Sequence, residues 1–498
     1  MTAVPEEDFV AMPRASSAYQ TVAYQIVFGL AVFGLGTFLV HSAMNGSYGT
    51  VRIVVFGLLA VAVALLLDKN YLLLCPLFSI YHVAVPGLPF SLNELGALSF
   101  LTLFFVRLSM KREKLAPAHP YTWFAWPYFV WALMTYFRNP VGLAMFGASG
   151  IGARYYFDIC LGFFVLLAFS RVRFSDKQCN TLFWWMVAVS ALTVVRNYFM
   201  QDADADDAWT YEDSNHSTRY WLDPVVFVAL LLMCRYCVAD ILKSVRRFFF
   251  VSATIALIVY SGRRTYTGYA FLAPFFLAVM RGREKFLTLV CALAAMTVVM
   301  FIAVGNGRAY ELPLSVQRAL SPLPGKWDRS LDNYGTKDLF REEMKRLAKE
   351  EIAKDPLFGR GGLQLSFEEV AWAHRSDSRG STGEGMAQVG NWHNKFWGMS
   401  ADFGLPAGFF WYIFACAAGW YAFKNRFSMR GGGARSALAL YYSLLLFYDL
   451  VFTMGGSAMT PSTRWPQFAF LLALLNPPAE DDPSGSGLAA SGRPGGTA

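Results

Sequence analysis

The feature that most constrains this chain is a series of apolar stretches between residues 21 and 476. A helix needs about 20 apolar residues to cross the hydrocarbon core of a bilayer, and most of these stretches approach that length. Only 16% of the residues are charged, whereas a soluble domain usually carries about 25%. We therefore predict an all-α, polytopic transmembrane helical bundle of about 12–14 spans. The candidate spans are 21–44, 51–67, 71–87, 91–109, 121–138, 153–172, 178–200, 219–242, 247–261, 264–280, 285–304, 394–423, 436–455 and 462–476.

Basic residues gather in the polar segments on one side of these spans. The positive-inside rule assigns such segments to the cytoplasm, which places both termini inside. The net charge of +8 is then a topology signal. No basic face with interleaved aromatics appears, so we expect no nucleic-acid partner. The basic residues of the predicted inner segments are Lys111, Arg112, Lys114, Arg171, Arg173, Lys177, Lys243, Arg246, Arg247, Arg281, Arg283, Lys285, Lys424, Arg426, Arg430 and Arg435.

The same topology divides the chain into five parts. A cytoplasmic segment (1–20) precedes helices 1–11 (21–304), a large outer loop (305–392) and helices 12–14 (393–476). The last part, 477–498, is rich in Gly, Ser and Pro, which predicts a disordered cytoplasmic tail.

The large outer loop contains an amphipathic pattern over 337–354. Apolar residues recur there at helical spacing among charges of both signs, which predicts a helix that ends at Asp355-Pro356. A second outer loop, 201–218, is acidic but lacks the glycine and the closing glutamate of a calcium-binding loop. Cys234 and Cys237 form a CxxC inside a predicted apolar helix, where two buried side chains on one helix face are the favoured interpretation.

Arginines collect at the outer ends of the predicted spans, against the positive-inside bias. They are Arg138, Arg154, Arg196, Arg219, Arg263, Arg264 and Arg464. For a single arginine, contact with headgroups or with a local acid explains the position as well as function does. Arg263 and Arg264 differ, because they are adjacent in a tight turn without an obvious acid partner. Two neighbouring guanidinium groups suit a phosphate, whose oxygens they bind bidentately.

His393 lies where the outer loop re-enters the membrane, between Trp392 and Asn394. A histidine in this place can accept a proton near neutral pH. The alternative is an aromatic-belt residue beside Trp392. The residues alone do not separate the two interpretations.

The order of these motifs resembles the O-antigen ligase and O-antigen polymerase superfamily of bacterial envelope proteins. That family has a "Pro, apolar, apolar, Gly, x, Gly" turn after an outer-loop helix, then a His followed by Asn or Ser, and a Gly about eleven residues on. It also has a "Ser, Arg, small" signature between two upstream helices and a further Arg before an earlier span. The matching residues here are Pro356 to Gly361, His393-Asn394, Gly404, Ser261 to Thr265, and Arg219.

The resemblance implies a glycan donor on undecaprenyl pyrophosphate and an acceptor hydroxyl on a lipid or glycan at the periplasmic face of the bacterial inner membrane. Arg264 would stabilise the leaving pyrophosphate, with Arg263, Arg219 and Arg154 as further substrate contacts. His393 would act as the general base, with Asn394 orienting the hydroxyl. We expect no metal and no cofactor, membrane lipids as surroundings, and other envelope polysaccharide assembly proteins as partners. The amphipathic helix would gate the cavity as a lid.

Two functions of other classes stay open. A transporter or flippase for lipid-linked glycans is compatible with this number of helices, although we find no half-repeat and few mid-membrane charges. A membrane scaffold would need no arginines at a cavity. Within the resembled family, ligase, polymerase and protein O-glycosylation activities, and the sugars involved, are not separable by these residues.

Overall fold

The computed structural model describes residues 68–73, 75–76, 92–110, 115–117, 119–138, 153–200, 222–282, 285–328, 336–361, 395–429, 432–452 and 461–476. All of them belong to one structural unit, Leu67–Ala84 with Pro89–Ala498. The predicted segment 1–20, the spans 21–44 and 51–67, most of the span 71–87, the acidic loop 201–218 and the tail 477–498 lie outside the described residues.

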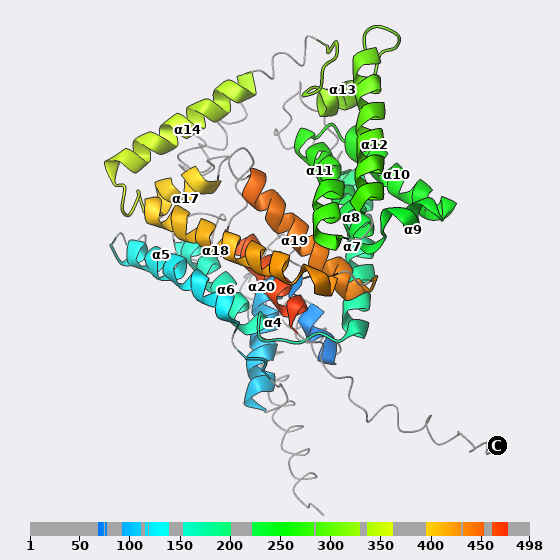
Figure 1. Ribbon diagram of the computed structural model, residues 1–498. Helices are drawn as coiled ribbons and strands as arrows, with labels where there is room; N and C mark the ends of the chain where they lie inside the picture. Colours follow the sequence, from blue (N-terminus) through cyan, green and yellow to red (C-terminus); the bar gives the residue numbers. More distant parts are fainter. Residues whose placement is uncertain are drawn as a thin grey trace, which may run out of the picture. The chain divides into compact units, whose positions relative to one another are not determined.

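Helices account for nearly all of the described chain, which contains no β-strand and only an isolated bridge between Asn306 and Tyr310 (Figure 1). The all-helical prediction is confirmed for this part. The elements are η1 (Asp68–Leu73), α4 (Leu92–Ser109), η2 (Pro120–Ala125), α5 (Trp126–Arg138), α6 (Ala153–Phe169), α7 (Asp176–Met200), α8 (Asp223–Arg235), α9 (Val238–Leu242), α10 (Val245–Tyr260), α11 (Arg264–Arg281), α12 (Lys285–Gly305), α13 (Leu314–Leu320), α14 (Thr336–Lys354), α17 (Lys395–Phe403), α18 (Leu405–Lys424), η5 (Arg426–Met429), α19 (Ala434–Phe452) and α20 (Pro461–Leu475).

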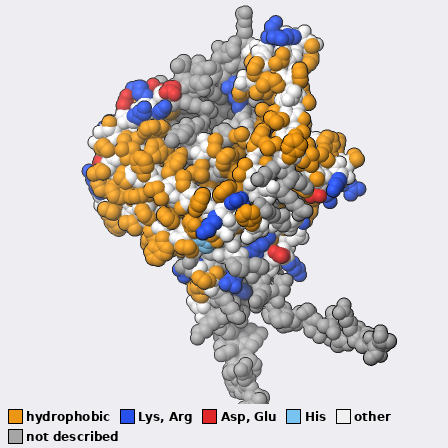
Figure 2. All heavy atoms as spheres, viewed as in Figure 1, with side chains coloured by type: hydrophobic (Ala, Val, Ile, Leu, Met, Phe, Trp, Pro, Cys, Tyr) orange, Lys and Arg blue, Asp and Glu red, His pale blue; other side chains and the backbone are white. Residues whose placement is uncertain are grey.

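Three of these helices contain segments long and apolar enough to cross a membrane, which indicates a membrane protein. The segments are Asp176–Val195 in α7, Phe286–Gly305 in α12 and Ala434–Val451 in α19. Hydrophobic side chains cover much of the face in Figure 2, with Lys and Arg side chains toward its margins. On α12, Phe286 and Phe301 are 82% and 73% exposed. Such surfaces suit lipid contact. The count of 12–14 spans and the sidedness stay predictions.

The protein core forms around α19, which contacts α7, α8, α11, α18 and α20. A cluster of buried aromatic rings lies beside it, in which the indoles of Trp411 and Trp465 are 5.2 Å apart in an edge-on arrangement. Gly162 on α6 admits Trp465 of α20, because a Cβ at Gly162 would lie 2.4 Å from the indole Cδ1. A small residue at a close helix crossing is typical of membrane helix packing.

The prediction of one span over 394–423 is wrong, because the chain breaks at Gly404 into α17 and α18. Gly404 has a φ of +85°, which ends α17, and Pro406 lies in the first turn of α18. A left-handed backbone at this position favours glycine. The short helix α17 therefore packs against both α18 and α14.

The predicted span 219–242 is also interrupted. Helix α8 ends at Arg235, and Cys237 is the N-cap of α9. The guanidinium of Arg281, at the end of α11, donates to the carbonyls of Cys234 and Tyr236. These bonds satisfy C-terminal carbonyls that a continuous helix would have paired internally. Cys234 and Cys237 thus do not share one helix face, contrary to the prediction.

The ends of α6, α19 and α20 on the predicted inner side are joined through backbone carbonyls. Arg435, in the first turn of α19, donates to the carbonyl of Leu474 at 3.0 Å and to that of Phe174 at 2.8 Å. Its third bond goes to the carbonyl of Asn476, whose side-chain amide donates to the Ser170 carbonyl at 2.8 Å. Hydrogen bonds from charged donors are among the stronger ones in proteins.

Candidate functional site

The turn that carries Arg263 and Arg264 joins α10 to α11, as predicted. Helix α10 ends at Tyr260, and Gly262 follows with a φ of +78°. The backbone N–H of Arg263 then donates to the buried Ser261 hydroxyl at 3.4 Å, and Arg263 forms the extended N-cap of α11. The Thr267 hydroxyl donates to the Arg263 carbonyl at 3.0 Å. Local hydrogen bonds and one glycine therefore fix the start of α11 and with it the backbone positions of the two arginines.

Arg263 has an acid partner, which corrects the premise that neither arginine has one. Its guanidinium lies 2.8 Å from Oδ2 of Asp223, the first residue of α8. The guanidinium also lies over the ring of Tyr266, 5.3 Å from the ring centre. Asp223 precedes Arg263 by forty residues, so only the packing of α8 against α10 and α11 reveals the pair.

Arg264 is placed differently from its neighbour. It is the first residue of α11, and it is exposed. Its Nε donates to the carbonyl of Arg318 at 3.2 Å. The N-terminus of an 18-residue helix adds partial positive charge at the same place, and the N-cap residue Arg263 makes no side-chain cap hydrogen bond. An exposed guanidinium beside a helix N-terminus can bind an anion.

Arg318 is a neighbour that the sequence reasoning missed. It lies in the short helix α13, which contacts α10 and α11, and it is only 9% exposed. Its carbonyl accepts the bond from Arg264 Nε. The available signal was an arginine amid apolar residues, from Leu314 to Leu320, inside an otherwise polar loop.

A second constellation brings together the two glycine motifs of the C-terminal half. The turn that follows α14 lies directly against the α17–α18 break: Leu405 N–H donates to the Pro356 carbonyl at 2.9 Å. Gly359 has a φ of +65°, and a Cβ there would lie 2.5 Å from the Ala401 carbonyl oxygen. At Gly404 a Cβ would lie 1.9 Å from the Leu357 carbonyl oxygen. At both positions the backbone of another segment occupies the space that a Cβ would need, so only glycine fits.

Helix α5 holds the same turn from another side. Trp131 Nε1 donates to the carbonyls of Phe403 at 3.0 Å and Leu357 at 3.2 Å, and its ring stacks on Phe358. Arg138, one of the outer-end arginines, lies 2.6 Å from a carboxylate oxygen of Asp355 and over the Phe358 ring. Arg138 thus has a local acid partner, as the non-functional interpretation of these arginines expects.

The remaining predicted site residues are placed only in part. Arg154 is the second residue of α6, and its side chain lies outside the described residues. Arg219, His393 and Asn394 also lie outside them, with His393 two residues before the start of α17. The arginine turn, residues 261–265, contacts α8 and α13. The glycine turn, residues 355–361, contacts α5 and α17. Within the described ranges, no group of three His, Cys, Asp or Glu side chains could hold a metal ion.

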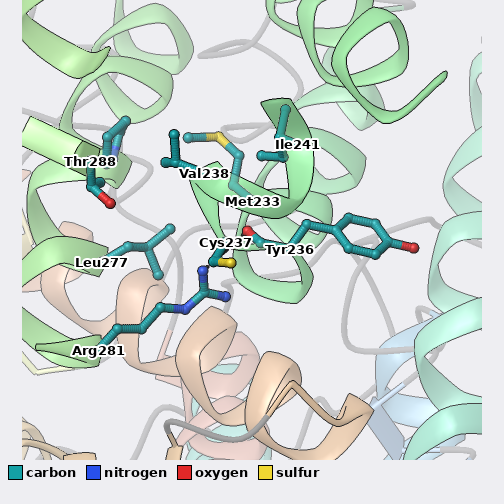
Figure 3. A pocket seen from close by; sticks show the side chains of 9 residues that line it. Met233, Tyr236, Cys237, Val238, Ile241, Leu277, Arg281 and Thr288 are labelled. Carbon is teal, nitrogen blue, oxygen red and sulfur yellow. Dashed lines mark hydrogen bonds between the residues drawn. The ribbon is translucent and has the colours of Figure 1, made fainter. Parts of the chain in front are cut away.

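A small cavity of about 50 Å³ lies at the other end of α11. An 18-residue helix is about 27 Å long, which separates this cavity from Arg264. Figure 3 shows the guanidinium of Arg281 pointing toward Tyr236 and Cys237. Because Arg281 already binds two helix carbonyls there, its role is structural.

No model of a known protein family matches the chain, and no curated protein matches it in sequence.

Proposed function

We propose that this protein is a membrane glycosyltransferase that moves a glycan from undecaprenyl pyrophosphate to an acceptor hydroxyl at the periplasmic face. The observation that carries the proposal is the turn between α10 and α11. There, the exposed Arg264 lies at a helix N-terminus, beside an arginine that Asp223 already holds. Cations fixed in place before the reaction stabilise a leaving group that gains negative charge.

The pairing of Arg263 distinguishes the roles of the two arginines. The contact with Asp223 fixes the guanidinium of Arg263 and places a carboxyl group beside it. The Nε of Arg264 donates to the backbone carbonyl of Arg318, which orients the exposed guanidinium. We therefore assign the pyrophosphate contact to Arg264 and a supporting position to Arg263.

The proposed reaction breaks the bond between sugar C1 and the pyrophosphate oxygen and forms a bond from C1 to the acceptor oxygen. The acceptor proton passes to His393, and the negative charge remains on undecaprenyl pyrophosphate beside Arg264. Asn394, Arg219 and Arg154 are proposed substrate contacts. The contact between the turn ending in Gly361 and the break at Gly404 supports this proposal, because both pieces belong to the motifs that resemble the ligase and polymerase family.

The transporter alternative is less well supported. Alternating access requires the inner ends of the helices to separate during the cycle. The bonds from Arg435 and Asn476 join α19, α20 and the segment between α6 and α7 at the predicted inner side, so these elements would have to move as one body.

The test is transfer by purified protein supplied with lipid-linked donor and acceptor in excess chelator. We expect Arg264→Ala to lower kcat by about 10²–10³-fold, as loss of a pre-placed charge stabiliser does. Arg264→Lys should recover only part of the rate, since an ammonium binds phosphate through a single point. The control is Arg308→Lys, at an exposed arginine that follows α12. Full activity of Arg264→Ala, or a strict need for divalent ions, would contradict the proposed mechanism.

A further inference from the structure

A second ion pair lies where the outer loop meets α17, away from the arginine turn. Arg360 Nε donates to Oδ1 of Asp402 at 2.8 Å, and the two side chains are only 19% and 11% exposed. Arg360 follows α14 by six residues, and Asp402 lies in the last turn of α17. A buried charge that loses its partner is strongly destabilised, so this pair resists separation.

Backbone hydrogen bonds run alongside the ion pair. The N–H of Arg360 donates to the Ala401 carbonyl at 2.9 Å, and that of Gly361 to the Asp402 carbonyl at 3.0 Å. Together with the Leu405 N–H bond to the Pro356 carbonyl, these bonds attach the turn to both sides of the α17–α18 break. We call the ion pair and these three bonds the latch.

Helix α14 contacts α17 as well, through its apolar face. Met344, Ala348 and Ile352 form a buried cluster with Ala401 of α17, and Figure 1 shows the two helices side by side. The opposite face of α14 carries exposed ion pairs, such as Arg346 with Glu343. To swing open, α14 would have to expose the apolar cluster and break the latch at the same time.

We propose that Arg360 and Asp402 are positioning residues that fix α17, so that α14 is a permanent brace and not the movable lid that its amphipathic pattern suggested. This inference rests on the proposed function, because α17 is the helix that the predicted general base directly precedes. The chain enters α17 at Lys395, and the latch at the other end of this nine-residue helix sets the helix position. Misplacement of a catalytic group by about 1 Å can cost 10²-fold in rate.

The first experiment measures amide hydrogen exchange and transfer kinetics of Asp402→Asn, which removes the charge and keeps the shape. We expect exchange at residues 357–361 and 401–405 to become at least about tenfold faster, as the latch opens. We expect kcat to fall by about 10²-fold with KM for the donor unchanged. The matched control, Glu343→Gln, removes an exposed ion pair of α14 and should change neither quantity. Unchanged exchange in Asp402→Asn overturns the latch.

The second experiment replaces the latch by a covalent link. Arg360→Cys with Asp402→Cys, in a background where the exposed Cys416 is Ser, is joined by a short bifunctional thiol reagent. A brace predicts low transfer before cross-linking and recovery after it, whereas a lid predicts that cross-linking abolishes transfer. If the wild-type protein transfers no glycan, the proposed function fails, while the exchange data still decide whether the latch exists.

Discussion

Substitution of Gly404 by alanine tests most directly the backbone contact between the turn that follows α14 and the break between α17 and α18. Gly404 has a φ of +85° and a ψ of +163°, a conformation essentially limited to glycine, which costs a residue with a Cβ on the order of 1–3 kcal/mol. The added Cβ would lie 1.9 Å from the carbonyl oxygen of Leu357 and 2.8 Å from the backbone nitrogen of Phe358. Since the obstructing atoms belong to the backbone, a side-chain rotation cannot relieve the overlap, and the turn has to move away.

Moving the turn breaks the three backbone hydrogen bonds of the latch, each worth roughly 1 kcal/mol net. With the backbone strain, the expected loss in the free energy of unfolding is on the order of 4–6 kcal/mol. That loss is a large part of the roughly 5–15 kcal/mol by which proteins are usually stable.

The assay is denaturant unfolding of the purified protein in detergent, followed by tryptophan fluorescence. Trp131 is one of the fourteen tryptophans that contribute to the signal, and it lies at the contact itself, since its ring stacks on Phe358 and its Nε1 donates to Phe403 and Leu357. The control is Gly419→Ala, within α18, where the nearest atom to a new Cβ is 3.7 Å away. We expect that variant to be neutral or more stable by roughly 0.5–1 kcal/mol. A loss below about 1 kcal/mol for Gly404→Ala would refute the close-contact argument.

Two further predictions concern the predicted inner side. Arg435→Gln loses its charged bonds to three carbonyls and should lower stability by on the order of 3 kcal/mol, measured by denaturant unfolding. An unchanged midpoint would contradict the stabilising role of these three bonds. Burial lowers the pKa of His119 to about 4, so its neutral form is favoured in the folded state. The free energy of unfolding therefore does not depend on His119 above the ordinary histidine pKa of about 6.5. It falls as the pH drops from there toward 4, by up to about 3 kcal/mol in total, because the unfolded chain takes up the proton first. His119→Phe should remove this pH dependence. If the free energy of unfolding of that variant still fell between pH 6.5 and 4 as in the wild type, His119 would not be its cause.

The sequence predicted those features of the fold that depend on local pattern. Helix α11, predicted over 264–280, runs from Arg264 to Arg281, and α12, predicted over 285–304, runs from Lys285 to Gly305. Charged residues at the ends of an apolar stretch mark where the helix begins and ends, so these bounds can be found in the local sequence. The turn at Gly262 and the amphipathic pattern of α14 also depend on neighbouring residues alone, and the sequence predicted both.

The features that the sequence did not predict depend on residues distant in the chain. The break between Arg235 and Val238 has no glycine or proline, and its carbonyls bind Arg281, more than forty residues later. The partner of Arg263 likewise comes from another helix, at Asp223. The break at Gly404 did have a local signal, a glycine two residues before Pro406, but the apolar run around it concealed that signal.

The contrast between α12 and α19 has a consequence for how the chain enters the membrane. Helix α12 holds the most apolar of the three membrane-length segments, and only 17% of that segment is buried, whereas the segment of α19 is less apolar and 72% buried. A strongly apolar helix partitions into lipid by itself. Helix α19 gains most of its stabilisation from neighbours, so its insertion depends on helices made before it, and mutations on its packed face should reduce the yield of assembled protein before they affect any reaction.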